Sequence, residues 1–177
     1  AAMSLGLAGV LCFGALLATG SPSWALVGIK LGSFGLLLPV YLTVAHRMFP
    51  FFAGNVVPGY RPWRPMWVLG AIWALSLAHL VLEVVHAYAW LWLVDLPLTV
   101  LALYVLGRWW PGRAAPGLLG VLAAGLLWWP VSFALYALQS LVYLQSGVFV
   151  LGRAPAHALF VGLFASVLVA MVTRVTQ

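Results

Sequence analysis

An all-α, polytopic membrane bundle of about six transmembrane helices is the fold class that this sequence predicts. Hydrophobic residues make up 66% of its 177 residues and charged residues only 6%, whereas globular proteins average about 25% charged residues. The apolar residues also form runs of about 20, the length that crosses a bilayer as a helix. Short segments rich in Pro, Gly and Arg separate these runs. We therefore expect a single transmembrane domain over residues 1–177.

Breakers between the apolar runs set the limits of the predicted spans. Gly20-Ser-Pro-Ser23 ends the first span, and Pro155 is a favourable first residue for the last. Pro39 predicts a kink in the second span, and the Pro and Arg residues from 46 to 65 predict a long loop after it. The six spans are expected at about residues 1–19, 24–45, 66–86, 90–107, 117–145 and 155–173.

Basic residues are distributed unevenly between the two sides of this predicted bundle. With six spans, the 46–65 loop, the 108–116 loop and the C-terminus share one side. That side carries Arg47, Arg61, Arg64, Arg108, Arg113 and Arg174, and the other side only Arg153 and Lys30. Because short loops rich in Lys and Arg stay in the cytoplasm, we expect both ends of the chain there. The same rule accounts for the net charge of +6 without a nucleic-acid partner.

The third span carries the most informative polar pattern, Ser76, His79, Glu83 and His86. Steps of three and four residues place the four side chains on one stripe of a helix. Groups of this kind inside a bilayer are costly and normally face protein or a functional site. One interpretation is a hydrogen-bonded seam between helices in which Lys30 pairs with Glu83. The other is a cofactor or metal site, because imidazole binds metals and haem iron and Glu-x-x-His recurs in carboxylate metal sites.

Other ionisable residues are expected at the same depth, in the outer leaflet. Lys30, Asp95 and His157 belong to three different spans, and Arg153 lies just before the last one. Lys30 is either the counter-ion of Glu83 or Asp95 or, like Arg153, a clamp for an acidic cofactor group such as a propionate. His157 is either a hydrogen-bonding residue at a helix start or a ligand. The helix that it opens has a ladder of small residues for close packing, at Ala158, Gly162, Ser166 and Ala170.

His46 and Arg47 lie at the opposite end of the predicted bundle, beside Phe49-Pro-Phe-Phe52. His46 is either an interface histidine or part of a second site. The run His46-Arg-Met-Phe-Pro-Phe-Phe52 resembles the Arg-x-x-Pro-Phe-Phe signature of the NnrS family. The segment from Pro155-Ala-His157 to Arg174 is similar to that family's last helix, which begins His-Ala-Leu and ends Met-Thr-Arg.

The resemblance implies a haem- and copper-containing protein of the bacterial inner membrane that acts in the response to nitric oxide. Family members have about twelve spans, so this chain would match their C-terminal half. Its start without Met and its end at Gln177 fit the same expectation of a longer protein. The lipid bilayer, the N-terminal half or another membrane subunit, and nitric oxide are the expected partners.

These observations together predict haem b, and copper beside it, in the outer leaflet. We expect His157 as one axial ligand of the haem and His86 or His79 as the other. The remaining histidine of the third span would serve copper, with Glu83 as a ligand or as the acceptor that fixes the imidazole tautomer. Haem beside a second metal could reduce or oxidise nitric oxide, and whether turnover occurs stays open. The alternatives are a proton-coupled transporter with Lys30, Glu83, Asp95 and the histidines as a relay, and an assembly subunit without catalysis.

Overall fold

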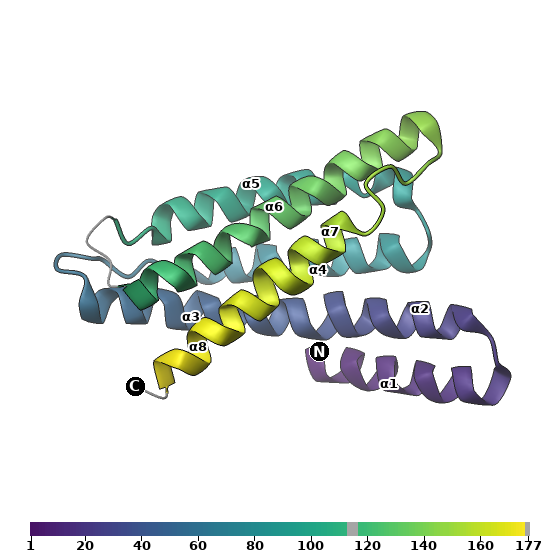
Figure 1. The fold of residues 1–177 in the computed structure, drawn as a ribbon, viewed down its shortest axis with the longest axis horizontal. Helices are drawn as coiled ribbons and strands as arrows, with labels where there is room; N and C mark the ends of the chain where they lie inside the picture. Colours follow the sequence, from purple (N-terminus) through teal and green to yellow (C-terminus); the bar gives the residue numbers. More distant parts are fainter. Residues whose placement is uncertain (113–116, 176–177) are drawn as a thin grey trace.

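A computed structural model describes residues 1–112 and 117–175, and nearly all of these residues form a bundle of long helices (Figure 1). Six helical segments are long and apolar enough to span a membrane. This result confirms the predicted fold class. The elements are α1 (Ala2–Thr19), α2 (Pro22–Lys30), η1 (Leu31–Leu37), α3 (Leu38–Val56), α4 (Met66–Val84), η2 (Tyr88–Trp90), α5 (Trp92–Trp109), α6 (Gly117–Ser146), α7 (Ala154–His157), η3 (Ala158–Ala165) and α8 (Ser166–Val175).

The second span is longer than predicted, and the expected loop at 46–65 is wrong over its first half. α2, η1 and α3 form one continuous helical segment, Pro22–Val56. Pro50 lies inside α3, where it removes only one backbone hydrogen bond. Phe49 and Ala53 beside it are buried in the core, and this packing keeps the segment helical. The connection to α4 therefore begins only after Val56.

Two segments of the bundle are π-helical instead of α-helical. They are η1 in the second span and η3 in the sixth. Such segments are rare and frequently lie at functional sites. η1 directly follows Lys30, and η3 directly follows His157. Each π-helical segment therefore begins beside a basic residue that the sequence singles out.

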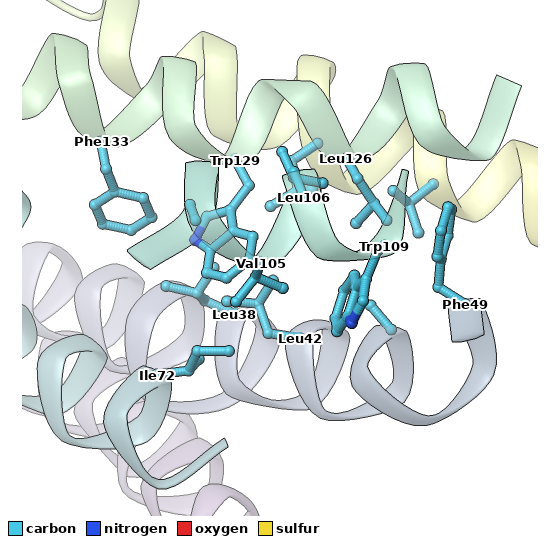
Figure 2. Packing of buried hydrophobic residues seen from close by; sticks show 14 of the residues in the cluster. Leu38, Leu42, Phe49, Ile72, Val105, Leu106, Trp109, Leu126, Trp129 and Phe133 are labelled. Atoms are coloured by element: carbon cyan, nitrogen blue, oxygen red, sulfur yellow. The ribbon is translucent and has the colours of Figure 1, made fainter. Parts of the chain in front are cut away.

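The core lies where α3, α4, α5 and α6 meet (Figure 2). Two tryptophans dominate it, Trp109 from α5 and Trp129 from α6, and both are almost completely buried. Aliphatic side chains from all four helices fill the space between them, among them Leu38, Leu42, Ile72, Val105, Leu106 and Leu126. This packing holds α4 and α5 side by side, which positions the polar residues described below.

The outer helices pack through small residues. α1 lies along α2, where the backbones approach at Gly9 and Gly28; a Cβ on Gly28 would lie 3.0 Å from the Gly9 carbonyl oxygen. The sixth span lies along α6, and a Cβ on Gly162 would lie 2.5 Å from the Trp128 ring. Gly125 of α6 meets Ser166 in the same way. The predicted small-residue ladder is thus confirmed as a packing surface.

The connection between α3 and α4 is fastened to α5 by neutral hydrogen bonds. The Trp109 indole donates to the Trp63 carbonyl at 2.9 Å, and the Tyr60 hydroxyl donates to the Trp109 carbonyl at 3.2 Å. Burial raises the pKa of Tyr60 above its ordinary value, so this hydroxyl remains a donor. His46 adds a bond from Nε2 to the Pro65 carbonyl at 3.2 Å. These bonds fix the end of the bundle that bears most of the arginines.

Candidate functional site

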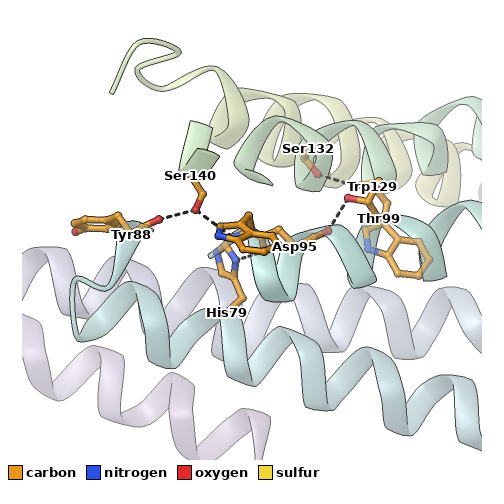
Figure 3. A network of polar contacts seen from close by, with 8 residues as sticks. His79, Tyr88, Asp95, Thr99, Trp129, Ser132 and Ser140 are labelled. Atoms are coloured by element: carbon orange, nitrogen blue, oxygen red, sulfur yellow. Dashed lines mark hydrogen bonds and ion pairs between the residues drawn. The ribbon is translucent and has the colours of Figure 1, made fainter. Parts of the chain in front are cut away.

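His79 of α4 and Asp95 of α5 form a pair in the bundle interior (Figure 3). Their atoms Nδ1 and Oδ1 are 2.6 Å apart, and both side chains are 0% exposed. Thr99, one turn along α5, donates to the Asp95 backbone carbonyl at 2.7 Å. Because Asp95 occupies Nδ1, the imidazole is held in one orientation and its second nitrogen, Nε2, is left for another partner.

Three aromatic rings surround the His79 imidazole. Ring centroids lie 4.3 Å away for Phe34 of η1, 5.0 Å for Tyr136 and 5.5 Å for Phe133, both of α6. Within the described part of the chain, His79 Nε2 and Asp95 Oδ2 are buried without a hydrogen-bond partner. A buried polar atom in this state costs about 1–3 kcal/mol. The pair is therefore incomplete as it stands, and this is the geometry expected of a ligand-binding imidazole.

Lys30 reaches across from α2 to the end of α4. Its Nζ lies 3.1 Å from Glu83 Oε2 and also donates to the Glu83 backbone carbonyl and, at 3.0 Å, to the Tyr88 hydroxyl. The ammonium thereby neutralises the carboxylate and satisfies a carbonyl at the negative end of the α4 dipole. The predicted pairing of Lys30 with Glu83 is confirmed, in agreement with the seam interpretation of the stripe.

His86 lies beyond the last turn of α4 and is exposed. Its φ of 60° is left-handed, a conformation in which helices commonly end. Nδ1 lies 3.3 Å from the Glu83 carbonyl, and the ring stacks on Tyr88. His86 therefore terminates α4 and does not continue the buried stripe toward His79.

His157 is exposed and lies over a different face of α6 from His79. It lines a groove of about 470 Å³ together with Trp128 and Leu135. These two residues, seven apart, share one face of α6, whereas His79 packs against Phe133 and Tyr136 on another. His157 Nδ1 donates to the carbonyl of Arg153 at 2.8 Å, so Nε2 keeps its lone pair. Arg153 is itself exposed.

His46 is separate from all of these residues. It is 2% exposed, lies near Trp109 and donates to the Pro65 carbonyl, while its neighbour Arg47 is exposed. At this end of the bundle α3 ends and α4 begins, whereas Glu83 lies at the opposite end of α4. His46 is thus a buried side chain that links α3 to the residue before α4, away from His79.

The predicted metal ligands His79, Glu83, His86 and His157 do not come together. Among residues 1–112 and 117–175, no group of three His, Cys, Asp or Glu side chains is close enough to hold a metal ion. Ser76, His79 and Glu83 do lie on one stripe of α4. However, Glu83 is paired with Lys30, α4 ends before His86, and α6 lies between His79 and His157. Asp95 as the partner of His79 was not assigned from the sequence. The aromatic rings were also missed, although Phe133, Tyr136 and Ser140 follow one another on one face of the fifth span.

A comparison with models of protein families decides the affiliation of the chain. The model described as NnrS protein matches residues 1–177, the whole sequence. The chain belongs to the NnrS family. No curated protein and no solved structure matches this NnrS chain significantly.

The family implies haem and copper, and the described residues fit the two unequally. His79 offers an unpartnered Nε2 and a carboxylate at Nδ1, the arrangement that metal-binding histidines have. One such imidazole suffices as the protein ligand of a haem iron. Binding of a haem at His79 requires the aromatic rings around it to move apart, because the imidazole is fully buried among Phe34, Phe133 and Tyr136. A copper site of several histidine and carboxylate ligands does not fit, since the described residues assemble none.

Proposed function

We propose that this NnrS chain acts in the nitric-oxide response of the bacterial inner membrane, with His79 as the ligand of a haem b. One observation carries the assignment: His79 is bound to Asp95 at 2.6 Å through Nδ1 and is left without a partner at Nε2. When bound, haem supplies an iron that can take a diatomic ligand such as nitric oxide. Copper remains an expectation from the family, with no group of described residues to support it.

The chain's own residues have distinct roles in this proposal. Asp95 holds the imidazole in the tautomer that presents a lone pair at Nε2 and increases its basicity. Phe34, Phe133 and Tyr136 exclude water from the site. The Lys30–Glu83 pair fixes the end of α4 one turn beyond His79, which keeps the imidazole at a constant height. Tyr88 and Ser140 tie the following turn to α6 through the bond from Ser140 Oγ to the Tyr88 carbonyl.

The orientation in the membrane is part of the same proposal. Arg47, Arg61, Arg64 and Arg108 lie at one end of the helices, and Lys30 and the two acids lie toward the other. The positive-inside rule places the arginine end in the cytoplasm. Both ends of this chain are then cytoplasmic, and His79 lies in the periplasmic half of the bilayer.

A visible spectrum of the full-length protein, together with metal analysis, tests the haem assignment. We expect a Soret band and sharp reduced α/β bands that are lost in His79→Ala and shifted in Asp95→Asn. His86→Ala and His157→Ala are matched controls, because each removes one exposed imidazole, and both should keep the spectrum. His46→Ala should keep it as well.

The outcome also decides between this site and the two-histidine haem expected from the sequence. A normal spectrum in His79→Ala would refute the assignment. Loss of the bands in His157→Ala instead would move the haem to the groove beside Trp128.

A proton-coupled transporter is the second candidate, and two neighbouring pairs of ionisable side chains favour it. Each of the pairs Lys30–Glu83 and His79–Asp95 includes one residue of α4, and these two residues, Glu83 and His79, are four positions apart. Both pairs lie within the spans. Chains of buried ionisable groups of this kind serve as proton relays in transporters. The absence of any haem spectrum, combined with proton uptake into proteoliposomes that Asp95→Asn abolishes, would establish this function instead.

A further inference from the structure

A small polar pocket lies at the arginine-rich end of the bundle, where α3 ends. Its volume is about 170 Å³, and its lining residues are Phe51, Gly54, Asn55, Tyr60, Pro62 and Arg64. A Cβ on Gly54 would lie 3.1 Å from the Pro62 ring, so α3 and the following connection close the pocket on one side. Arg64 contributes a guanidinium and Asn55 an amide, two groups that donate hydrogen bonds to phosphate oxygens.

Charge makes this pocket selective for anions. The only acidic residues of the whole chain are Glu83 and Asp95. Both lie toward the other end of the spans, at the C-terminal end of α4 and the N-terminal end of α5. No carboxylate therefore competes with an anion for Arg64. The pocket also lies at the end of a helical segment, Pro22–Val56, that is long and apolar enough to span a membrane.

A second, apolar groove lies farther along the same helix. Its volume is about 220 Å³, and it lies between α3, α6 and α8. Val40, Val44 and Met48 line it from α3. Steps of four, four, three and four residues place these three side chains on one stripe with two residues of the polar pocket, Phe51 and Asn55. The four apolar members of the stripe are between 38% and 53% exposed, which makes it continuous.

The dimensions of the stripe match a lipid. From Asn55 to Val40 the helix rises by about 22 Å, somewhat more than half of the roughly 30 Å hydrocarbon core of a bilayer. A lipid with an anionic head and an acyl chain is therefore long enough to extend along this stripe from the pocket to the groove. We propose that this face of α3 is a binding site for an anionic phospholipid, with the phosphate at Arg64 and Asn55 and one acyl chain in the groove beside Val44 and Met48.

Lipid titration of the purified full-length protein in detergent tests the head of this site. Phosphatidylglycerol should raise the unfolding temperature more than phosphatidylcholine with the same acyl chains. Arg64→Gln should weaken phosphatidylglycerol binding about fivefold or more. Arg61→Gln is the matched control, since Arg61 is in the same connection but does not line the pocket. Equal binding of the two lipids, or equal losses in the two variants, would overturn the proposal in favour of a general attraction to positive charge.

The acyl-chain groove has a test of its own. Val44→Phe fills the groove and should weaken phosphatidylglycerol binding, whereas Val10→Phe, on an exposed position of α1, should not. Glycerol phosphate, which has the head without the chain, should bind much more weakly than the lipid. Binding of glycerol phosphate as tight as that of the lipid would mean a free-anion site and would refute the lipid assignment.

Discussion

The two ends of the bundle differ in the partners of their polar side chains. At one end, four ionisable side chains within the spans are paired with one another, Lys30 with Glu83 and His79 with Asp95. At the other end, Arg47, Arg61, Arg64 and Arg108 are exposed, and neutral side chains such as Trp109 and Tyr60 donate hydrogen bonds to backbone carbonyls. Neutral bonds suffice to fasten a connection. Charged groups inside a membrane cost free energy, and holding a connection in place does not require them. We therefore expect functional residues at the end that carries the Lys30–Glu83 and His79–Asp95 pairs.

The largest effect should come from breaking the His79–Asp95 pair. Asp95→Ala leaves a fully buried imidazole without its partner, and we expect a loss of about 3–5 kcal/mol in the free energy of unfolding. Asp95→Asn keeps the volume and one hydrogen-bonding oxygen and should cost less. Unfolding in detergent micelles measures both, with exposed His157→Ala as the control. Equal losses in Asp95→Ala and His157→Ala would contradict the distinction between buried and exposed histidines.

A double-mutant cycle on Lys30 and Glu83 should show a smaller, coupled effect. This pair is slightly exposed, so each of Lys30→Met and Glu83→Gln should cost about 1–3 kcal/mol, less than a fully buried pair. The double variant should recover part of the summed loss, because neither charge is then left alone. Losses that add strictly would mean that the 3.1 Å contact contributes no interaction energy.

The arginine end should respond only weakly to loss of one of its bonds. Tyr60→Phe removes the donor to the Trp109 carbonyl and should cost about 0.5–1.5 kcal/mol. Tyr104→Phe, at an exposed tyrosine of α5, is the matched control and should be close to neutral. A loss in Tyr60→Phe as large as in Asp95→Ala would remove the contrast between the two ends.

Cysteine labelling perturbs the protein least and tests which end faces which compartment. Cysteines at Asn55 and Gly112 should resist a membrane-impermeant reagent added from the periplasm, whereas one at His86 should react. The background is low because the single native cysteine, Cys12, is buried. Efficient labelling at Asn55 from the periplasm would reverse the orientation and with it the depth assigned to His79.

The sequence was sufficient for the fold class and for one pair, because both depend on composition and depth. Long apolar runs require helices in a bilayer, and Lys30 and Glu83 are the kind of charges that must compensate each other there. The 46–65 loop was predicted partly because proline usually breaks a helix. In the structure α3 continues past Pro50, because the burial of Phe49 and Ala53 outweighs the one backbone hydrogen bond that Pro50 removes.

The predicted ligand set stays a prediction, because the described residues do not gather its members into one cluster. Residues at one depth can still point in different directions, and the rotation of each helix about its axis follows from packing, which a single sequence does not give. Phe133 and Tyr136 of α6 close around His79, and Trp128 and Leu135 of the same helix face His157. Depth alone therefore could not show that α6 separates the two histidines.

The π-helical segment η1 has a consequence for how this protein tolerates change in chain length. It starts directly after Lys30, which contacts Glu83, and contains Phe34, which contacts His79, so two positions four residues apart both contact α4. Deleting one residue here would shorten the step from Lys30 to Phe34 from four residues to three and would change the direction of one of these side chains relative to the other. One of the two contacts would then be lost. Insertions and deletions between residues 30 and 34 are consequently far more restricted than substitutions, and the unusual helix preserves the spacing itself.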